Sequence, residues 1–159
     1  MSATARGASG GATTAGHPAP APDRRPTERK PGFEHRLTVR YLEVDQQGVV
    51  FNAWYLAYLD EAMTGYLTAR GVPYATLTGA GIDVQLVHTE LDWRGAARFG
   101  DELAVGVTTG SLGRTSFALA FEARRGDEVL VTARTVYVVV ALDGSGKREV
   151  PPFLRTALA

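Results

Sequence analysis

One long helical stretch followed only by strands is the feature that most constrains the fold of this chain. Between residues 52 and 70, apolar side chains recur at the spacing of one helix face. That stripe consists of Leu56, Leu59, Met63 and Tyr66. Gly71 and Pro73 then predict the end of the helix. Because a helix this apolar needs a surface to pack on, we expect an α+β fold with one helix on a curled antiparallel sheet.

The predicted sheet comes from alternating apolar residues before and after the helix. The predicted strands span residues 35–41, 82–93, 103–107, 115–123 and 129–142. In the second of these the apolar phase changes near Val87, which predicts a β-bulge there. The last strand is apolar at nearly every position from Val136, a pattern typical of a strand covered on both faces. One helix covers only one face, so we predict a homodimer or homotetramer.

Length and composition indicate one small domain. The chain has 159 residues, a formal net charge of +0 and 21% charged residues, so the charge gives no reason to expect nucleic acid or a membrane as a partner. Residues 1–32 lack apolar periodicity and the apolar core of a signal peptide. We therefore predict a disordered tail over 1–32, a folded domain over 33–159, and a cytoplasmic protein.

The residue types exclude several kinds of chemistry. There are no cysteines, which rules out disulfides, thiolate metal ligands and a cysteine nucleophile. The three histidines, His17, His35 and His88, are scattered and show no metal-ligand spacing. We expect neither a metal nor a cofactor.

The stretch RYLEVDQQGVVFNAWYLAYLDEA, residues 40–62, contains the best candidate for chemistry. Asp45 is a carboxylate in a loop just before the helix, and Gly48 follows where the backbone needs special freedom. Asn52 is predicted to cap the helix. Free N–H groups at a helix start favour negative charge, so they can hold a carboxylate or polarise a carbonyl oxygen.

The order D-x-x-G-V-V-aromatic-N-x-x-Y in that stretch, from Asp45 to Tyr55, resembles the hot-dog-fold acyl-CoA thioesterases. It is most similar to the 4-hydroxybenzoyl-CoA thioesterase type. The resemblance covers roughly residues 33–154. It implies a hot-dog fold and hydrolysis of an acyl-CoA thioester to a free acid and CoA, at a site formed between two subunits.

The resemblance also implies roles for particular residues. Asp45 matches the acidic catalytic position, as nucleophile or general base, although a loop aspartate making an Asx-turn has the same pattern. Asn52, or the backbone N–H of Asn52 or Ala53, polarises the thioester carbonyl. Relatives often carry His or Tyr at the position of Asn52. The predicted substrate-binding residues beside these are Gly48, Val50, Phe51 and Tyr55.

A second part of the resemblance concerns the nucleotide end of CoA. The related enzymes have a basic, serine-containing run where this chain has Arg114 and Ser116, and arginine suits phosphate through its forked donors. Gly113 and Thr115 stand where basic residues are expected, so the match is partial. Glu61 on the helix is a candidate second acid of the site.

Three other functions fit the same pattern. The substrate of a hydrolase can be a thioester bound to a carrier protein. A hot-dog hydratase or dehydratase is a second alternative, although it needs a histidine near the helix start and none occurs between His35 and His88. A non-catalytic acyl-CoA-binding module is the third, and it has no need of Asp45.

Overall fold

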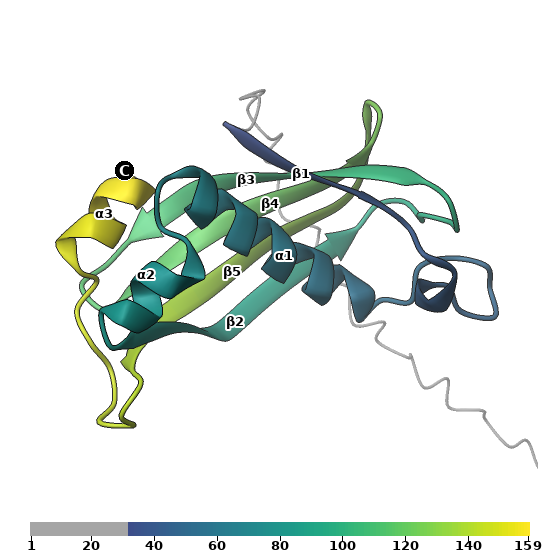
Figure 1. Ribbon diagram of the computed structural model, residues 1–159. Helices are drawn as coiled ribbons and strands as arrows, with labels where there is room; N and C mark the ends of the chain where they lie inside the picture. The colour runs from purple at the N-terminus through teal and green to yellow at the C-terminus, as the bar shows by residue number, and fades with distance from the viewer. Residues whose placement is uncertain (1–31) are drawn as a thin grey trace, which may run out of the picture.

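Five antiparallel strands form one curled sheet with a long helix along one of its faces (Figure 1). The structure, a computed structural model, describes residues 32–159, so the predicted tail lies outside the described residues except for Gly32. The elements in chain order are β1 (Phe33–Thr38), the 3₁₀-helix η1 (Tyr41–Glu43), α1 (Trp54–Ala69), α2 (Tyr74–Gly79), β2 (Ile82–Trp93), β3 (Glu102–Leu112), β4 (Ser116–Arg125), β5 (Glu128–Ala141) and α3 (Pro152–Leu158). The predicted α+β class and hot-dog fold are confirmed.

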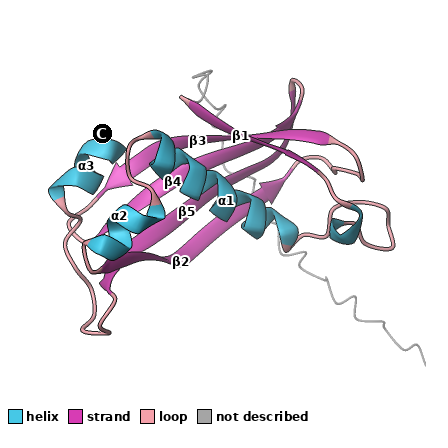
Figure 2. Ribbon diagram, viewed as in Figure 1, coloured by secondary structure: helices cyan, strands magenta, loops and turns pink. Residues whose placement is uncertain are grey.

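The strand order in the sheet is β1-β3-β4-β5-β2, with every neighbouring pair antiparallel. In Figure 2 the helix α1 crosses the sheet, while α2 and α3 lie near one end of it and η1 lies at the other. The two outer strands are β1 and β2. Within the described part of the chain, β2 pairs only with β5, so its other edge has unpaired backbone groups.

The end of α1 forms as the sequence predicts, but its beginning does not. The N–H groups of Gly71 and Val72 bond to the carbonyls of Thr68 and Leu67, a Schellman motif made possible by the positive φ of 80° at Gly71. The prediction that Asn52 caps the helix is wrong. The helix begins at Trp54, and no side chain caps it because backbone carbonyls of residues 51–53 already accept its first N–H groups.

The predicted bulge in β2 is confirmed as a register shift between Leu86 and His88 against β5. Before the shift Val84 pairs with Val139, and after it Leu91 pairs with Ala133. The bulge therefore turns the apolar residues of both halves of β2 to one face of the sheet.

Several boundaries differ from the sequence predictions. β1 ends at Thr38 rather than at residue 41, and β3 continues to Leu112, beyond the predicted strand 103–107, with a register shift between Thr109 and Ser111. The sequence analysis missed α2, which is too short to show periodicity. It also missed α3, because Pro151 and Pro152 suggest a tail, yet proline is favourable in the first helical turn.

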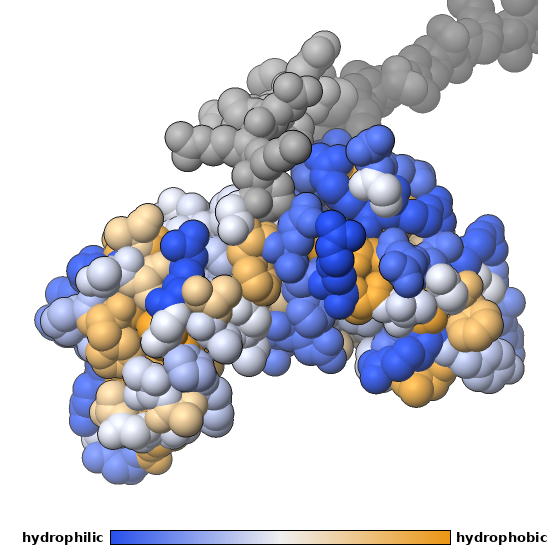
Figure 3. Space-filling model, turned by 45° about the horizontal axis from the view of Figure 1, so that its top comes forward, coloured by the Kyte–Doolittle hydropathy of each residue, from blue (hydrophilic) through white to orange (hydrophobic). Residues whose placement is uncertain are grey.

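The core lies between α1 and the sheet. Residues of α1 that are buried there are Tyr55, Tyr58, Leu59, Ala62, Met63, Tyr66 and Leu67. Opposite them, Phe117 of β4 stacks on Tyr137 of β5, with ring centroids 5.4 Å apart. On the face shown in Figure 3, apolar side chains form separate patches between polar ones, a pattern that does not mark a large docking surface.

The Schellman motif gives a testable prediction. Gly71→Ala should destabilise the protein by about 1–2 kcal/mol, because a residue with a Cβ is strained at positive φ. The matched control is Gly79→Ala in α2, which lies at negative φ with open space around its Cβ position, so we expect no loss. Urea denaturation measures both. Equal stability of the two variants would contradict the assignment of the motif.

Candidate active site

Asp45 lies in a short β-hairpin between η1 and α1. Val44 and Val50 form an isolated antiparallel bridge, and the N–H of Asp45 donates to the carbonyl of Val49 at 2.9 Å. The N–H of Gly48 donates to the carbonyl of Asp45 at 2.9 Å, and Gly48 has a φ of 72°. The special backbone freedom predicted for Gly48 is therefore used to close this turn.

The side chain of Asp45 is half-buried and retains one free oxygen. Its Oδ1 accepts the N–H of Gln47 at 2.8 Å, the contact of an Asx-turn. Its Oδ2 has no hydrogen-bond partner among residues 32–159. The turn contact and a chemical role are therefore compatible.

The residues just before α1 supply two unused donors. The N–H groups of Trp54, Tyr55 and Leu56 donate to carbonyls three residues earlier. By contrast, the N–H groups of Asn52 and Ala53 donate to no group in the described part of the chain. These are the donors that the sequence analysis expected to meet a carbonyl oxygen.

A buried glutamate stands next to this hairpin, and the sequence analysis did not find it. Glu43 is 1% exposed and accepts hydrogen bonds from the N–H and Nε of Arg40, both at 2.7 Å, and from the hydroxyl of Tyr58 at 2.6 Å. Burial favours its neutral form, but the bonds from Tyr58 and Arg40 outweigh burial and lower the pKa of Glu43. Burial, then the bond to Glu43, raises the pKa of Tyr58.

The loop after β2 packs against the hairpin and adds an arginine. The N–H of Val50 donates to the carbonyl of Ala97 at 2.9 Å, and Nη1 of Arg98 donates to the carbonyl of Gly48 at 3.4 Å. The side chain of Arg98 is exposed. No sequence pattern marked Arg98, because it lies 50 residues beyond Gly48 in the chain.

The other predicted substrate-binding residues near the hairpin separate into two groups. Val50 and Tyr55 belong to the core, and Tyr55 is only 2% exposed, so within one chain neither presents a free surface. Phe51 is 53% exposed and is the member of this set that is open to solvent.

Arg114 and Ser116 lie at the opposite end of the sheet from Asp45. β4 begins at Ser116 and ends at Arg125, whose Nη1 contacts Asp101 in the loop beside the hairpin. Ten residues of extended strand separate the two ends by about 30 Å. Arg114 is exposed and paired with Glu149 at 2.9 Å. One chain therefore does not bring Arg114 and Asp45 together.

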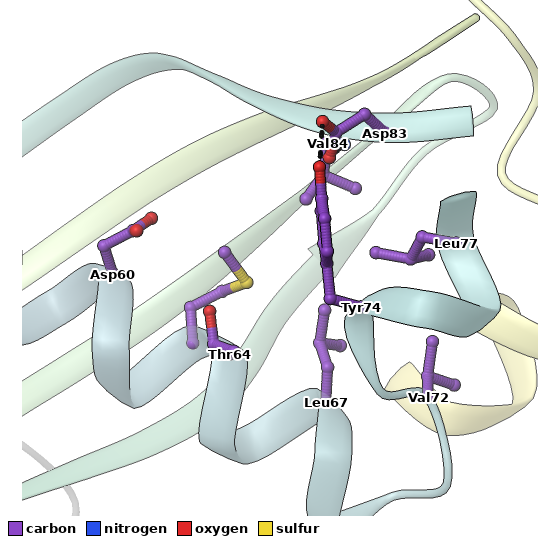
Figure 4. Close-up of a pocket in the computed structure, with 9 residues that line it drawn as sticks. Asp60, Thr64, Leu67, Val72, Tyr74, Leu77, Asp83 and Val84 are labelled. Carbon is purple, nitrogen blue, oxygen red and sulfur yellow. Dashed lines mark hydrogen bonds between the residues drawn. The ribbon is translucent and has the colours of Figure 1, made fainter. Parts of the chain in front are cut away.

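A cavity of about 180 Å³ lies between α1, α2 and the start of β2 (Figure 4). Its apolar lining consists of Met63, Leu67, Val72, Leu77 and Val84. Asp60 and Thr64 border it from α1, and the hydroxyl of Tyr74 donates to Oδ2 of Asp83 at 3.0 Å across its rim. The cavity thus combines an apolar interior with polar groups, as small-molecule sites do.

Leu56, Asp60 and Thr64 follow one another at intervals of four residues, so they form a row along one flank of α1. This row leads from the free N–H groups before the helix to the cavity. Burial and then the charge of Glu61 raise the pKa of Asp60. Glu61, the predicted second acid, pairs instead with His35 of β1 at 3.4 Å, which places it on another flank of the helix.

The core also contains a buried hydroxyl that has no hydrogen-bond partner among the described residues. Tyr137 of β5 is 1% exposed, and its hydroxyl has no hydrogen-bond partner among the described residues. Burial, followed by the charge of Asp60, raises the pKa of Tyr137. The neighbouring Thr135 is bonded to Thr89 at 2.9 Å. An unpaired buried hydroxyl is a place where water or a ligand group gains a hydrogen bond.

The fold and sequence together identify the family. The family model described as the thioesterase superfamily matches residues 47–132, more than half of the chain. The chain belongs to this superfamily, and it is a thioester hydrolase by class. The matched range begins just after Asp45 and includes Gly48, Asn52 and α1.

Three similar proteins have a CoA thioester in their names. The 1,4-dihydroxy-2-naphthoyl-CoA hydrolase of Nostoc punctiforme is 26% identical over 120 residues, 75% of this chain and 81% of that protein. The crystal structure of a 1,4-dihydroxy-2-naphthoyl-CoA thioesterase from Synechocystis aligns with a TM-score of 0.72 and 26% identity, covering 79% of this chain and 94% of that one. A 4-hydroxybenzoyl-CoA thioesterase complexed with 4-hydroxybenzoyl-CoA has the same fold, with a TM-score of 0.73, 22% identity and coverage of 80% and 98%.

Two features are absent from residues 32–159. No helix there has the length and apolar character needed to cross a membrane. Nor does that range contain a group of three or more histidine, aspartate or glutamate side chains arranged to hold a metal ion.

The unpaired hydroxyl of Tyr137 leads to a prediction about stability. Tyr137→Phe should keep or raise the free energy of unfolding, because it removes a buried polar group whose burial costs about 1–3 kcal/mol when unpaired. The control is Tyr66→Phe, whose hydroxyl is bonded to Thr109 at 2.8 Å and whose loss should destabilise by about 1 kcal/mol. Equal destabilisation of the two variants in urea denaturation would show that the Tyr137 hydroxyl has a partner such as an ordered water.

Proposed function

We propose that this protein is an acyl-CoA thioesterase that cleaves a thioester into a free carboxylic acid and CoA, with Asp45 as nucleophile or general base. The observation that carries the proposal is the unit formed by the hairpin and the start of α1. It has a carboxylate with one unpartnered oxygen and, seven and eight residues later, the two unpartnered N–H groups of Asn52 and Ala53.

The chemistry requires two functions, which this unit supplies. As general base, Asp45 removes a proton from water, whose oxygen attacks the thioester carbonyl. As nucleophile, it attacks the carbonyl itself, and water then hydrolyses the resulting anhydride. In both routes the negative charge developing on the carbonyl oxygen is stabilised by N–H donors, the C–S bond breaks and the thiolate of CoA leaves.

The acyl group lies along the row of Leu56, Asp60 and Thr64, with its far end in the cavity. An apolar cavity of 150 Å³ in another protein is large enough for benzene, so a cavity of about 180 Å³ has room for a group of ring size. Relatives named for 1,4-dihydroxy-2-naphthoyl-CoA support a CoA thioester as the substrate. A thioester on a carrier protein is the alternative.

The active protein is a homo-oligomer in which β2 joins two subunits edge to edge. Support comes from the unpaired edge of β2 and from three exposed apolar residues on this strand, Leu86, Val87 and Trp93. In this arrangement the β2 strands of the two subunits pair antiparallel about their midpoints. The start of β2 in one subunit then lies beside the end of β2 in the other. In such a dimer, Arg114 contacts CoA phosphates in the site of the partner subunit.

The first test is Asp45→Asn, assayed for release of free thiol from short, long and aromatic acyl-CoA substrates. We expect kcat to fall by about 10²–10⁴-fold, the range for losing a general base or comparable group. Asparagine keeps the Asx-turn, so folding should be unaffected. The matched control is Asp143→Asn, because Asp143 makes the same Asx contact with the N–H of Ser145 at 2.9 Å, in a loop at the other end of the sheet.

Three outcomes would contradict parts of the proposal. Wild-type turnover in Asp45→Asn would exclude Asp45 from the mechanism. A wild-type protein that cleaves no CoA ester but cleaves carrier-bound thioesters would favour the alternative substrate, and binding of acyl-CoA without turnover would indicate a binding module.

The second test concerns the edge of β2. Val87 is 55% exposed, and Val87→Lys should prevent edge-to-edge pairing by placing a charge there. We expect light scattering to show a single-chain mass for this variant and thioesterase activity to fall with it. Glu34→Lys is the control, because Glu34 is also exposed but lies on β1, the strand at the opposite edge of the sheet. A wild-type protein with single-chain mass would refute the proposed assembly.

A further inference from the structure

Glu43 is a buried charged residue to which the proposed reaction assigns no part. It lies two residues before Asp45, and its side chain is 1% exposed. Its Oε1 accepts from Nε of Arg40 at 2.7 Å, and its Oε2 accepts from the N–H of Arg40 at 2.7 Å and from the hydroxyl of Tyr58 at 2.6 Å. Both oxygens are therefore held by strong, directional bonds.

The groups bonded to Glu43 come from three places that surround the candidate site. Arg40 lies between β1 and η1, where the chain enters the hairpin. Tyr58 is in the second turn of α1. The backbone carbonyl of Glu43 also accepts the N–H of Phe51 at 2.9 Å, where the chain leaves the hairpin. Asp45 and the free N–H groups of Asn52 and Ala53 all lie within the segment that these contacts enclose.

We propose that Glu43 is a positioning residue of this enzyme, which holds the Asp45 hairpin in register with the first turn of α1 through Arg40, Phe51 and Tyr58. This inference rests on the proposed function, in which Asp45 and the N–H groups act on one carbonyl. Glu43 does not touch the substrate. It acts through the residues that it holds.

Stability alone does not account for a carboxylate at this position. Replacing a buried charged group together with its partners by well-packed apolar residues is often neutral or stabilising, so stability does not require a carboxylate here. A carboxylate bonded in several directions instead restricts the relative positions of its donors. Catalysis is sensitive to such positions, since a displacement of about 1 Å can cost about 10²-fold in rate.

The experiment uses three variants and compares kcat with KM. Glu43→Gln keeps the shape of the side chain but removes its charge, and Tyr58→Phe removes one donor. The matched control is Tyr66→Phe, because Tyr66 is on the same helix and also makes one buried hydroxyl bond, to Thr109 at 2.8 Å. All assays run well below the melting temperature of the least stable variant.

We expect Glu43→Gln to lower kcat by about 10–100-fold with KM nearly unchanged, because the acyl-binding surface is intact while the reacting groups are displaced. Tyr58→Phe should show a smaller loss of the same kind. Tyr66→Phe should leave kcat at the wild-type value. A folded Glu43→Gln with wild-type kcat would overturn the proposal, as would equal losses of kcat in Tyr58→Phe and Tyr66→Phe. If Glu43→Gln does not fold, the comparison of kcat between Tyr58→Phe and Tyr66→Phe tests the proposal.

Amide hydrogen exchange tests the role of Glu43 independently of the proposed function. The N–H groups of Asp45 and Gly48 are hydrogen-bonded inside the hairpin, so their exchange rates report its order. Faster exchange in Tyr58→Phe than in Tyr66→Phe supports the holding role even if the wild type cleaves no thioester. Unchanged exchange in Tyr58→Phe, with unchanged kcat, refutes it.

Discussion

Burial of one side of α1 against the sheet is the contact on which the rest of the structure depends. Tyr55, Leu59, Met63 and Tyr66 bury their side chains there, and full burial of one large apolar side chain contributes about 1.5–3 kcal/mol. Because this contact sets the height of the helix above the sheet, it also sets where the free N–H groups before the helix point and how wide the space beside β2 is. The cavity is part of that space, so the candidate acyl site follows from how the helix packs.

The buried polar groups have a different role from the apolar core. Glu43 and Thr135 are the buried polar or charged residues of the described part of the chain, and both are hydrogen-bonded. The burial of Glu43 is tolerated because charged and neutral donors satisfy both of its oxygens. Tyr137 is the contrast, since its hydroxyl is buried without a partner. Glu43 is bonded to Arg40 and Tyr58, whereas Tyr137 leaves a hydrogen bond open within reach of the charge of Asp60.

Much of the fold follows from local patterns. The bounds of β2 and its bulge are readable from the alternation of residues 82–93, because a strand exposes alternate residues to one face and a phase change needs an extra residue. The end of α1 is equally local, since Gly71 permits the positive φ that closes it. The start of α1 is not. Asn52 has the side chain of a cap, but the backbone turn before Trp54 uses carbonyls instead.

The candidate site also combines residues that the sequence identifies with residues that only the packing reveals. By itself the sequence determined that Asp45, Gly48 and the start of α1 form one unit, because these residues are neighbours in the chain and turn chemistry is local. Only the tertiary structure decided that Glu43 is buried, that Arg98 lies on the hairpin, that Asp60 rather than Glu61 borders the cavity, and that Arg114 stands at the far end of the sheet. The physical reason is that burial and contact between distant segments depend on how helix and sheet pack, and packing leaves no period or spacing in the sequence that identifies a single side chain.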